Sequence, residues 1–409
     1  MKPKLLLFTN RLVVGGISND IIPLAYHLQT EFDILILYGE KEKDEVEADF
    51  LLTAYPGLKL KKIKSFKKTI NPFNDLLAYH DIKKVIRNFK AGIVHTHGPK
   101  SGLLGRYAAY KCKVPVIIHT FHGHHFHSYY NKFINWFLLK IEKKLSRITT
   151  KIVAISTWQK KELSEIYNII PSNKIQTISL GIESSRIGDD SATQRVVFRK
   201  KYNLTNETIA IGIAGRMVPI KNLSMFVQAA QNLKTVSSKQ LRFFIIGDGL
   251  LKKQVEQQCD ELNLSFTENA DGNADVVFTS WIEDIIPAMH AMDIVTLTSE
   301  NEGTPMSLIE AQWCGKPVVA TNVGGVRDIL INNETGFLVE VNDIKAMVSK
   351  LQLLIENDEL RTSMGKKATL FAAANFSKET EVENYKQLYK NLLTPKNIER
   401  LTCQYAPIE

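Results

Sequence analysis

Short apolar runs rich in Val, Ile and Leu alternate with stretches of helical periodicity from one end of the chain to the other. Runs of this kind are typical of strands buried on both faces, in parallel sheets covered by helices on both sides. The sequence therefore predicts an α/β fold. Thirteen runs are expected to form strands, at 4–10, 32–39, 59–63, 92–98, 114–120, 151–156, 174–179, 209–215, 241–247, 274–280, 293–299, 316–321 and 335–341.

The length of 409 residues allows two or three domains at roughly 150 residues each. Between residues 181 and 207 the sequence turns polar, with several Gly and Ser residues, which is typical of a linker. We therefore expect two Rossmann-like, doubly wound domains, the first at 1–185 and the second at 186–377. A final helix near 378–393 is expected to cross back onto the first domain.

The cysteine pattern and the apolar runs bear on the compartment. Four widely separated cysteines exclude a C-x-x-C zinc or dithiol motif and fit a reducing cytosol. The apolar run at 5–8 is too short for a secretory signal, and no run approaches the roughly 18 apolar residues of a membrane span. We therefore expect a cytoplasmic protein that does not cross a membrane.

The net charge of +9 hides a contrast between the two halves of the chain. Residues 1–200 hold 32 Lys and Arg against 17 Asp and Glu, whereas residues 201–409 hold 20 against 26. The excess is concentrated in residues 51–150, with 19 basic side chains against three acidic ones. A nucleic acid, an anionic membrane or a polyanionic substrate would each suit such a face.

Several expected strands end in glycine-rich or polar turns that lead into helices. Open α/β sheets bind their ligands at these carboxyl ends. If the two domains face each other, both sets of turns line one cleft. The turns are Gly15-Gly16, 95–98, 119–123, Gly215-Arg216, 247–249, 299–305 and Gly324-Gly325.

The segment 299–311 carries the most specific pattern. Thr304 is expected to cap a helix whose first residue is Pro305, so free backbone amides there would attract an anion. Glu302 and Glu310 flank this phosphate site and would repel a phosphate directly. They are therefore expected to accept hydrogen bonds from the sugar and ribose hydroxyls of a nucleotide sugar.

The missing positive charge follows the first expected strand of the same domain. Arg216 and Lys221 are expected to hold a diphosphate together. A guanidinium fork and an ammonium at that position stabilise the negative charge that a leaving phosphate gains.

These motifs together resemble the family-4 retaining glycosyltransferases of the GT-B fold. The resemblance rests on Glu302-x7-Glu310 with Gly303 and Pro305, the Gly-Arg…Lys segment, the Gly15-Gly16 loop and the turn at 120–123. Further matching segments are 246–249, 278–281 and 315–321, which leads to 324–325. The run 95–106 further resembles members that build cell-surface polysaccharides on a polyprenyl diphosphate lipid.

The resemblance implies a role for each motif in transferring a hexose or N-acetylhexosamine from a nucleoside-diphosphate sugar, expected to be a UDP-sugar. The acceptor would be a saccharide or a lipid-linked saccharide. The implied catalytic residues are Glu302 on the sugar hydroxyls, Arg216 and Lys221 on the diphosphate, and His122 on the transferred sugar. The implied donor-binding residues are Gly15, Gly16, Trp281, Ile282, Gly303, Thr304, Pro305 and, on the ribose, Glu310.

The resemblance also implies a front-face mechanism that keeps the anomeric configuration and needs no dedicated general base. Enzymes of the other large glycosyltransferase fold clamp a divalent ion with a D-x-D motif, and this sequence has none. Lys, Arg and helix amides can replace the charge of the metal. We therefore expect neither a metal nor a cofactor.

Five closely spaced histidines, at 119, 122, 124, 125 and 127, invite a metal-site interpretation. The pattern argues against it, because no Cys or nearby carboxylate completes a zinc shell and an extended strand would split them between two faces. His95 and His97 are equally compatible with an acceptor surface and with hydrogen-bonded histidines at a strand end.

The stretch 131–147 combines Phe and Trp with lysines, as an interfacial helix on an anionic bilayer would, although packing on a sheet explains the same apolar positions. The basic run Lys59–Lys68 adds to the membrane interpretation. Two alternatives to a glycosyltransferase remain open. One is a GT-B sugar-nucleotide epimerase, and the other is a nucleic-acid-binding protein, which would leave Glu302 and Glu310 unexplained.

Overall fold

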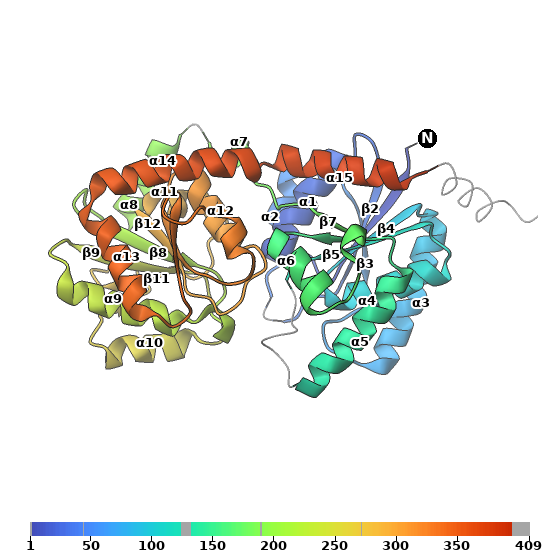
Figure 1. Cartoon of the computed structure of the whole chain (residues 1–409), viewed down its shortest axis with the longest axis horizontal. Coiled ribbons are helices and arrows are strands. Elements are labelled where there is room, and N and C mark those ends of the chain that lie inside the picture. The colour runs from blue at the N-terminus through green and yellow to red at the C-terminus, as the bar shows by residue number, and fades with distance from the viewer. Residues whose placement is uncertain (1, 44, 124–131, 189, 271, 395–409) are drawn as a thin grey trace, which may run out of the picture. The chain divides into compact units, whose positions relative to one another are not determined.

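The computed structural model describes residues 2–43, 45–123, 132–188, 190–270 and 272–394 (Figure 1). The chain forms two compact units. Unit 1 comprises the described residues up to Gly181 together with those from Lys378 onward, and unit 2 comprises Ile182–Ser377. The chain thus passes between the units twice, first a few residues before the boundary expected at 185.

Unit 1 is built on a parallel sheet of seven strands in the order β3-β2-β1-β4-β5-β6-β7. The strands are β1 (Lys4–Thr9), β2 (Asp33–Gly39), β3 (Lys59–Ile63), β4 (Ile93–His97), β5 (Val116–Phe121), β6 (Lys151–Ala154) and β7 (Ile175–Thr177). The helices are α1 (Gly16–Leu28), α2 (Asp49–Ala54), α3 (Pro72–Phe89), α4 (Pro99–Lys111), α5 (Lys132–Ile148), α6 (Thr157–Lys161) and α15 (Lys378–Leu392).

Side chains of β1 point alternately to the two faces of this sheet, as the period of a strand requires. Leu5 and Leu7 pack with α1, α2 and α15, whereas Leu6 and Phe8 pack with α3 and α4. Asn71 starts α3 by accepting hydrogen bonds from the backbone of Phe73 and Asn74, with Pro72 in the first turn. Both faces of the sheet are therefore covered.

Unit 2 repeats this architecture with the strand order β10-β11-β9-β8-β12-β13-β14, again all parallel. The strands are β8 (Ile209–Ala214), β9 (Leu241–Ile246), β10 (Phe266–Thr267), β11 (Val276–Phe278), β12 (Ile294–Leu297), β13 (Val318–Thr321) and β14 (Gly336–Val339). The helices are α7 (Ser184–Ile187), α8 (Ser191–Lys201), α9 (Leu223–Val236), α10 (Lys252–Glu261), α11 (Ile286–Ala291), α12 (Met306–Trp313), α13 (Ile344–Glu356) and α14 (Asp358–Asn375).

The predicted parallel sheets and α/β class are confirmed, and each of the predicted strands is present within a few residues of its expected ends. The strand β10 was not predicted, because two residues are too short to give a pattern. The last helix, α15, packs on α1 within unit 1. No described helix is long and apolar enough to cross a bilayer.

Candidate active site

The strand order places one crevice position in each unit. In an open parallel sheet, the loops after two neighbouring strands diverge where the strand order reverses, and ligands bind there. The reversal lies between β1 and β4 in unit 1 and between β8 and β12 in unit 2. The glycine pair after β1 and the histidines of β4 belong to the first position. The Gly215-Arg216 turn and the segment after β12 belong to the second.

In unit 2, Lys221 and Glu302 meet directly. The Lys221 ammonium lies 2.6 Å from Glu302 Oε1, and the hydroxyl of Ser299 donates to the same oxygen at 2.6 Å. The hydroxyl of Thr298 donates to the Lys221 carbonyl at 2.9 Å, which ties the loop after β8 to the end of β12. The structure thus brings together two of the four predicted catalytic residues in one ion pair.

Arg216 lies in the same loop as Lys221 but is exposed. Its guanidinium makes no hydrogen bond or ion pair within the part of the chain that the structure describes. The two cations of the predicted clamp therefore differ, because the Lys221 charge is balanced by Glu302 and the Arg216 charge faces solvent.

A glycine holds the backbone of Glu302 in place. Gly324 has φ +48°, and a Cβ on it would collide with the carbonyl group of Glu302. The amide of Gly325 donates to the same carbonyl at 3.3 Å. The Gly324-Gly325 motif thus acts through close packing against the loop that carries Glu302.

The helix α12 begins at Met306, so the predicted cap was wrong by one residue. Pro305, expected as the first helical residue, takes the capping position with extended dihedral angles, and no side chain caps the helix. The reason is geometric, because Pro305 adopts ψ 107° and therefore lies outside the helical region. Gly303 and Thr304 lie in the preceding loop, and Thr304 is buried.

Glu310 lies inside α12 and is buried, with 4% of its surface exposed. Burial raises the pKa of its carboxyl to about 7, an effect that nearby Arg186 partly offsets. Its side chain makes no hydrogen bond to the described residues. A hydroxyl group that donated to this carboxylate would therefore satisfy a buried charge.

The loop after β11 carries the predicted base-binding residues. The Trp281 side chain is 46% exposed, and Ile282 packs partly against the core. Asp248 organises this region, because its carboxylate accepts from the Ser280 hydroxyl at 2.8 Å and from the Gly249 amide at 2.7 Å. Asp248 thus ties the 247–249 turn to the end of β11.

In unit 1, Gly15 and Gly16 form the turn between β1 and α1. Gly15 has φ +154°, a conformation that favours glycine. A Cβ on either residue would meet nothing within 4 Å, and no side chain caps α1. The first amides of this helix therefore face open space, as an anion-binding turn requires.

His122 is partly exposed and contacts a second histidine. Its Nε2 lies 2.9 Å from Nδ1 of His97, which is buried at the end of β4. Burial lowers the pKa of both imidazoles, and lowers that of His97 well below its usual range. Both rings are therefore neutral near pH 7, and the N–H of one ring donates a hydrogen bond to the unprotonated nitrogen of the other.

The other described histidines of this region are structural. His95 bonds to the Tyr389 hydroxyl and to the Thr120 hydroxyl, both at 2.7 Å, and His119 bonds to the Thr96 hydroxyl at 2.9 Å. The described residues hold no group of three or more potential metal ligands. His124, His125 and His127 lie outside the described residues.

A buried ionic cluster beneath His97 and His122 escaped the sequence analysis. Lys378 Nζ lies 3.0 Å from Asp20 and 2.5 Å from Glu381, and all three side chains are buried. Burial opposes ionisation of Asp20, but Lys378 lowers the pKa of that carboxyl to about 2. One signal was available, because Asp20 is an acidic residue directly before the apolar run 21–25 of α1.

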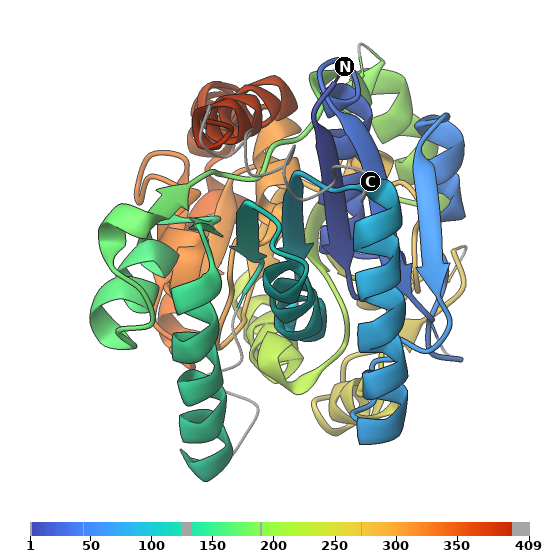
Figure 2. The ribbon, with the colours of Figure 1, turned by 90° about the vertical axis from the view of Figure 1, so that its right-hand side faces the viewer.

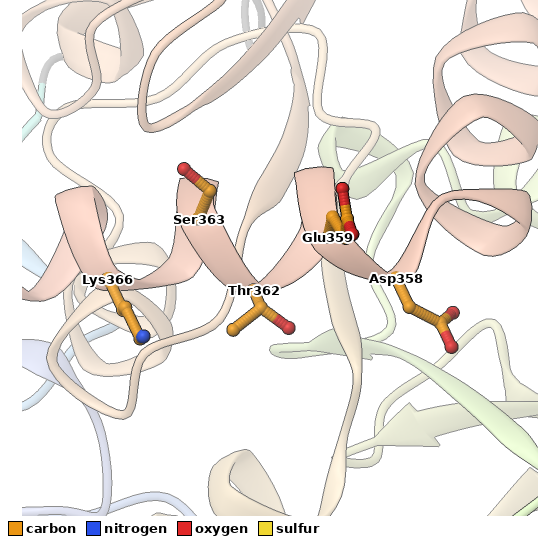
Figure 3. A pocket seen from close by; sticks show the side chains of 5 residues that line it. All are labelled: Asp358, Glu359, Thr362, Ser363 and Lys366. Atoms are coloured by element: carbon orange, nitrogen blue, oxygen red, sulfur yellow. The ribbon is translucent and has the colours of Figure 1, made fainter.

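Two open surface hollows lie elsewhere in unit 2. One is lined by Asp358, Glu359, Thr362, Ser363 and Lys366, all from α14 (Figure 3). The other, of about 310 Å³, borders His290, Cys314 and Lys316. Neither includes a predicted site residue, and a hollow formed by a single helix cannot enclose a substrate.

Two family descriptions match the chain in sequence. "Glycosyltransferase Family 4" matches residues 14–186, and "Glycosyl transferases group 1" matches residues 194–371. The fold and the two matches define a glycosyltransferase. The chain belongs to the glycosyltransferases of the GT-B fold that join a family-4 domain to a group-1 domain.

Two relatives are named for a lipid-diphosphate substrate and for capsular polysaccharide biosynthesis. An Escherichia coli UDP-Gal:α-D-GlcNAc-diphosphoundecaprenol α-1,3-galactosyltransferase is 26% identical over 80% of this chain and 83% of its own length. The Staphylococcus aureus capsular polysaccharide biosynthesis glycosyltransferase CapM is 29% identical over 80% of this chain and 84% of its own.

Solved structures share the fold. A Rickettsia africae glycosyltransferase superposes with a TM-score of 0.76 at 24% identity, over 96% of this chain and 99% of its own. Anabaena Alr3699/HepE, solved with UDP-glucose, superposes with a TM-score of 0.78 at 19% identity, over 95% of this chain and 99% of its own.

Proposed function

We propose that this glycosyltransferase moves a hexose or N-acetylhexosamine from a UDP-sugar to a saccharide or polyprenyl-diphosphate-linked acceptor, with retention of the anomeric configuration. The observation that carries the proposal is the cluster of Arg216, Lys221 and Glu302 at the strand-order reversal of unit 2. Two cations and one carboxylate there match a diphosphate joined to a sugar. The donor is assigned to UDP by analogy with the relative named for UDP-Gal and with the HepE complex.

The ion pair between Lys221 and Glu302 implies an order of events when the donor binds. A diphosphate carries more negative charge than a single carboxylate. It would therefore attract the Lys221 ammonium away from Glu302. Glu302 would then be free to accept hydrogen bonds from the sugar hydroxyls, with Ser299 still donating to it. Arg216 needs no such exchange, because it has no partner among the described residues.

The remaining site residues would hold the rest of the donor. Glu310 would accept from the ribose diol, while Trp281 and Ile282 would border the base. The loop of Gly303, Thr304 and Pro305 would carry the first amides of α12 toward the phosphates.

Unit 1 would supply His122 to the transferred sugar, while Gly15 and Gly16 would offer backbone amides to the phosphates. His122 would reach the sugar through the ring nitrogen that His97 leaves free. We therefore assign the acceptor role to unit 1 and the donor role to unit 2.

Transfer would proceed on one face of the sugar. The bond from the anomeric carbon to the UDP oxygen breaks, a bond from the same carbon to the acceptor oxygen forms, and the acceptor proton passes to the leaving phosphate. Arg216 and Lys221 stabilise the charge that develops on UDP, so the reaction would need neither a divalent ion nor a cofactor. No general base is assigned.

The acceptor and location follow from the same comparison. The relative named for a diphosphoundecaprenol substrate supports a lipid-linked acceptor here. We propose a cytoplasmic enzyme held peripherally on the inner face of the membrane, where such an acceptor is presented, with no nucleic acid as partner.

A thermal-shift screen of UDP-, GDP- and ADP-sugars tests the donor, because a ligand that binds only the folded state raises the melting temperature. UDP-sugars should raise it most, and the shift should be smaller in Glu310→Gln. Equal shifts with all three nucleotides would contradict the UDP assignment. UDP release without any acceptor, together with an epimerised sugar, would instead indicate an epimerase.

A further inference from the structure

The outer surface of α3, α4 and α5, here called the three-helix face, is strongly basic. The three helices lie beside one another on one side of the unit 1 sheet, with α4 in the middle (Figure 2). Their sequences contain eleven Lys and Arg against three Asp and Glu. These helices hold eleven of the 19 basic side chains of residues 51–150, and the other eight lie in the run 59–68 and at Lys90 and Lys113.

All three acidic side chains of these helices bond to unit 1 itself. Asp75 pairs with Lys100 at 2.6 Å, and Glu142 pairs with the buried Arg106 at 2.7 Å. Asp81 accepts from the hydroxyl of Ser65 at 2.8 Å. The exposed basic residues among the described part of this face are left facing solvent, and they are Lys84, Arg87, Lys111, Lys140, Lys143, Lys144 and Arg147.

Large apolar side chains are exposed at two ends of the same face. At the start of α3, Ile70 is 88% and Phe73 is 72% exposed, with Leu76 and Leu77 beside them. At the start of α5 the exposed apolar residues are Phe133, Ile134, Trp136 and Phe137, with Phe133 at 73%. Such exposure in patches is uncommon on a soluble surface and marks an interaction site.

The two apolar ends lie at one edge of the sheet. Helices that follow parallel strands begin at the carboxyl ends of those strands, so α3, α4 and α5 all start at that edge. Gly15, His97 and His122 also follow strands at the same edge. The apolar ends and the unit 1 part of the candidate site therefore share one rim.

Trp136 and the lysines fit a bilayer interface in detail. The Lys140 ammonium lies 3.7 Å from the centre of the Trp136 ring, so the aromatic ring and the charge occupy one position. Trp is favoured at the level of lipid headgroups, where one part of its ring is apolar and another polar. Exposed apolar residues that emerge beside cations are typical of helices that bind anionic membranes.

We infer that the three-helix face docks on an anionic bilayer, with the apolar starts of α3 and α5 inserted below the headgroups. A second copy of the chain would bring like charges together, and a nucleic acid would leave the exposed Phe, Ile and Leu side chains in water. That docking would bring the His122 rim to the lipid surface, a consequence that rests on the proposed lipid-linked acceptor.

The inferred surface keeps the helix expected at 131–147 but gives less weight to the basic run Lys59–Lys68. In the run Lys59–Lys68, Lys59 pairs with Asp33, and Lys62 pairs with Glu40 and Glu47. These pairs neutralise part of the run, which begins on the edge strand β3. The run therefore contributes less to docking than α5 and the start of α3.

Vesicle co-sedimentation of the full chain tests the charges. Wild type should bind vesicles containing phosphatidylglycerol and not vesicles of phosphatidylcholine alone, and high salt should release it. The triple variant Lys84→Gln, Lys143→Gln and Lys144→Gln should bind about a hundredfold more weakly. The matched control replaces three exposed lysines of unit 2 by Gln, namely Lys253, Lys366 (Figure 3) and Lys367, and should bind like wild type.

Vesicle binding by the two triple variants distinguishes an effect of the net charge from an effect of the three-helix face. Equal losses in the two triple variants would overturn the assigned face, because both lower the net charge by the same amount. No preference for phosphatidylglycerol, or tighter binding to duplex DNA than to the vesicles at the same salt concentration, would overturn the bilayer as partner.

Lipid insertion is tested by fluorescence quenching with acyl-brominated lipids. The tryptophan fluorescence of wild type should be quenched when the protein binds the vesicles. Trp136→Phe should lose most of that quenching while it still sediments with the vesicles. Quenching that is unchanged in Trp136→Phe would contradict insertion of α5. UDP release with a soluble acceptor should be the same in every variant, so failure of docking can be told apart from failure of the proposed reaction.

Discussion

The ion pair between Lys221 and Glu302 gives the two cations of the site different tasks. Lys221 orders the loop after β8 and holds Glu302, whereas Arg216 is free to meet a phosphate. Under the proposed function, loss of either positive charge would remove a group that stabilises the leaving diphosphate. Replacing Arg216 or Lys221 should therefore slow the transfer reaction much more than it destabilises the fold.

We predict that Arg216→Ala and Lys221→Ala each lower kcat about a hundredfold, the effect of removing one preorganised charge donor. The melting temperature of Arg216→Ala should be close to that of wild type, because this exposed side chain makes no hydrogen bond or ion pair to any residue that the structure describes. Steady-state kinetics with Lys221→Arg as the charge-preserving control measure the effect. Turnover near that of wild type in both alanine variants would remove these residues from the reaction.

Glu310 should make stability depend on pH. Its pKa is about 7 in the folded protein against a reference value of 4.5, because burial disfavours the charged form. The folded state therefore binds more protons than the unfolded state between these values, and stability falls as pH rises through that window. Ionisation of the buried carboxyl lowers the free energy of unfolding by about 3 kcal/mol at pH 8. This destabilisation is present above pH 7 and absent below pH 4.5.

Glu310→Gln should therefore increase the free energy of unfolding at pH 8 by up to about 3 kcal/mol and change it much less near pH 5. The same variant should bind UDP more weakly, because a neutral amide is a poorer acceptor for the ribose diol. Urea unfolding at both pH values gives the free energy of unfolding, and UDP titrations give the affinity for UDP. A variant that is destabilised at pH 8 would refute the buried-charge argument.

Among the secondary-structure elements, the parallel strands were predictable and several contacts between elements were not. A strand buried on both faces is a continuous apolar run, so thirteen of the fourteen strands that form the sheets begin within two residues of the expected position. The two-residue strand β10 leaves no such pattern. The start of α12 moved by one residue because Pro305 adopts extended dihedral angles, which its residue type alone does not reveal.

Site residues that belong to motifs were predictable. Contacts between residues distant in sequence were not. Lys221 and Glu302 were both expected, but their ion pair depends on the register of β8 and β12. Asp20 and Lys378 lie at opposite ends of the sequence, and only the fold brings them together. No local pattern records such a contact.

The contact of α15 with α1 depends on the buried ionic cluster. Removing Lys378 would leave Asp20 buried without its cation, and losing one partner of a buried pair costs about 3 to 5 kcal/mol. We predict that Lys378→Met destabilises the protein by this amount. Lys390→Met on the same helix, which removes an exposed partner of Glu31, should leave stability almost unchanged.

Urea unfolding compares the two variants. Adding Asp20→Asn to Lys378→Met should recover part of the loss, because the uncompensated charge is then removed. If Lys378→Met and Lys390→Met have equal effects, the cluster does not anchor α15.

At the scale of the whole molecule, the charge is divided between two tasks. A large share of the basic excess lies on the three-helix face of unit 1, whereas the proposed donor site of unit 2 would need only Arg216 and Lys221. An enzyme that neutralises a diphosphate with Arg, Lys and helix amides has no need of a divalent ion.

We therefore predict that activity survives exhaustive treatment with EDTA. Kinetics before and after chelation, with Mg²⁺ or Mn²⁺ added back, check this. Complete loss of activity that either metal restores would show that the diphosphate is neutralised in another way.

Acceptor-dependent release of UDP, followed together with the anomeric configuration of the product, tests the central claim most directly. The full-length enzyme is given a UDP-sugar and a polyprenyl-diphosphate-linked saccharide, and proton NMR assigns the new linkage. The account predicts that UDP appears only when the acceptor is present and that an α-linked donor yields an α-linked product. UDP release without acceptor, or a product of inverted configuration, would contradict it.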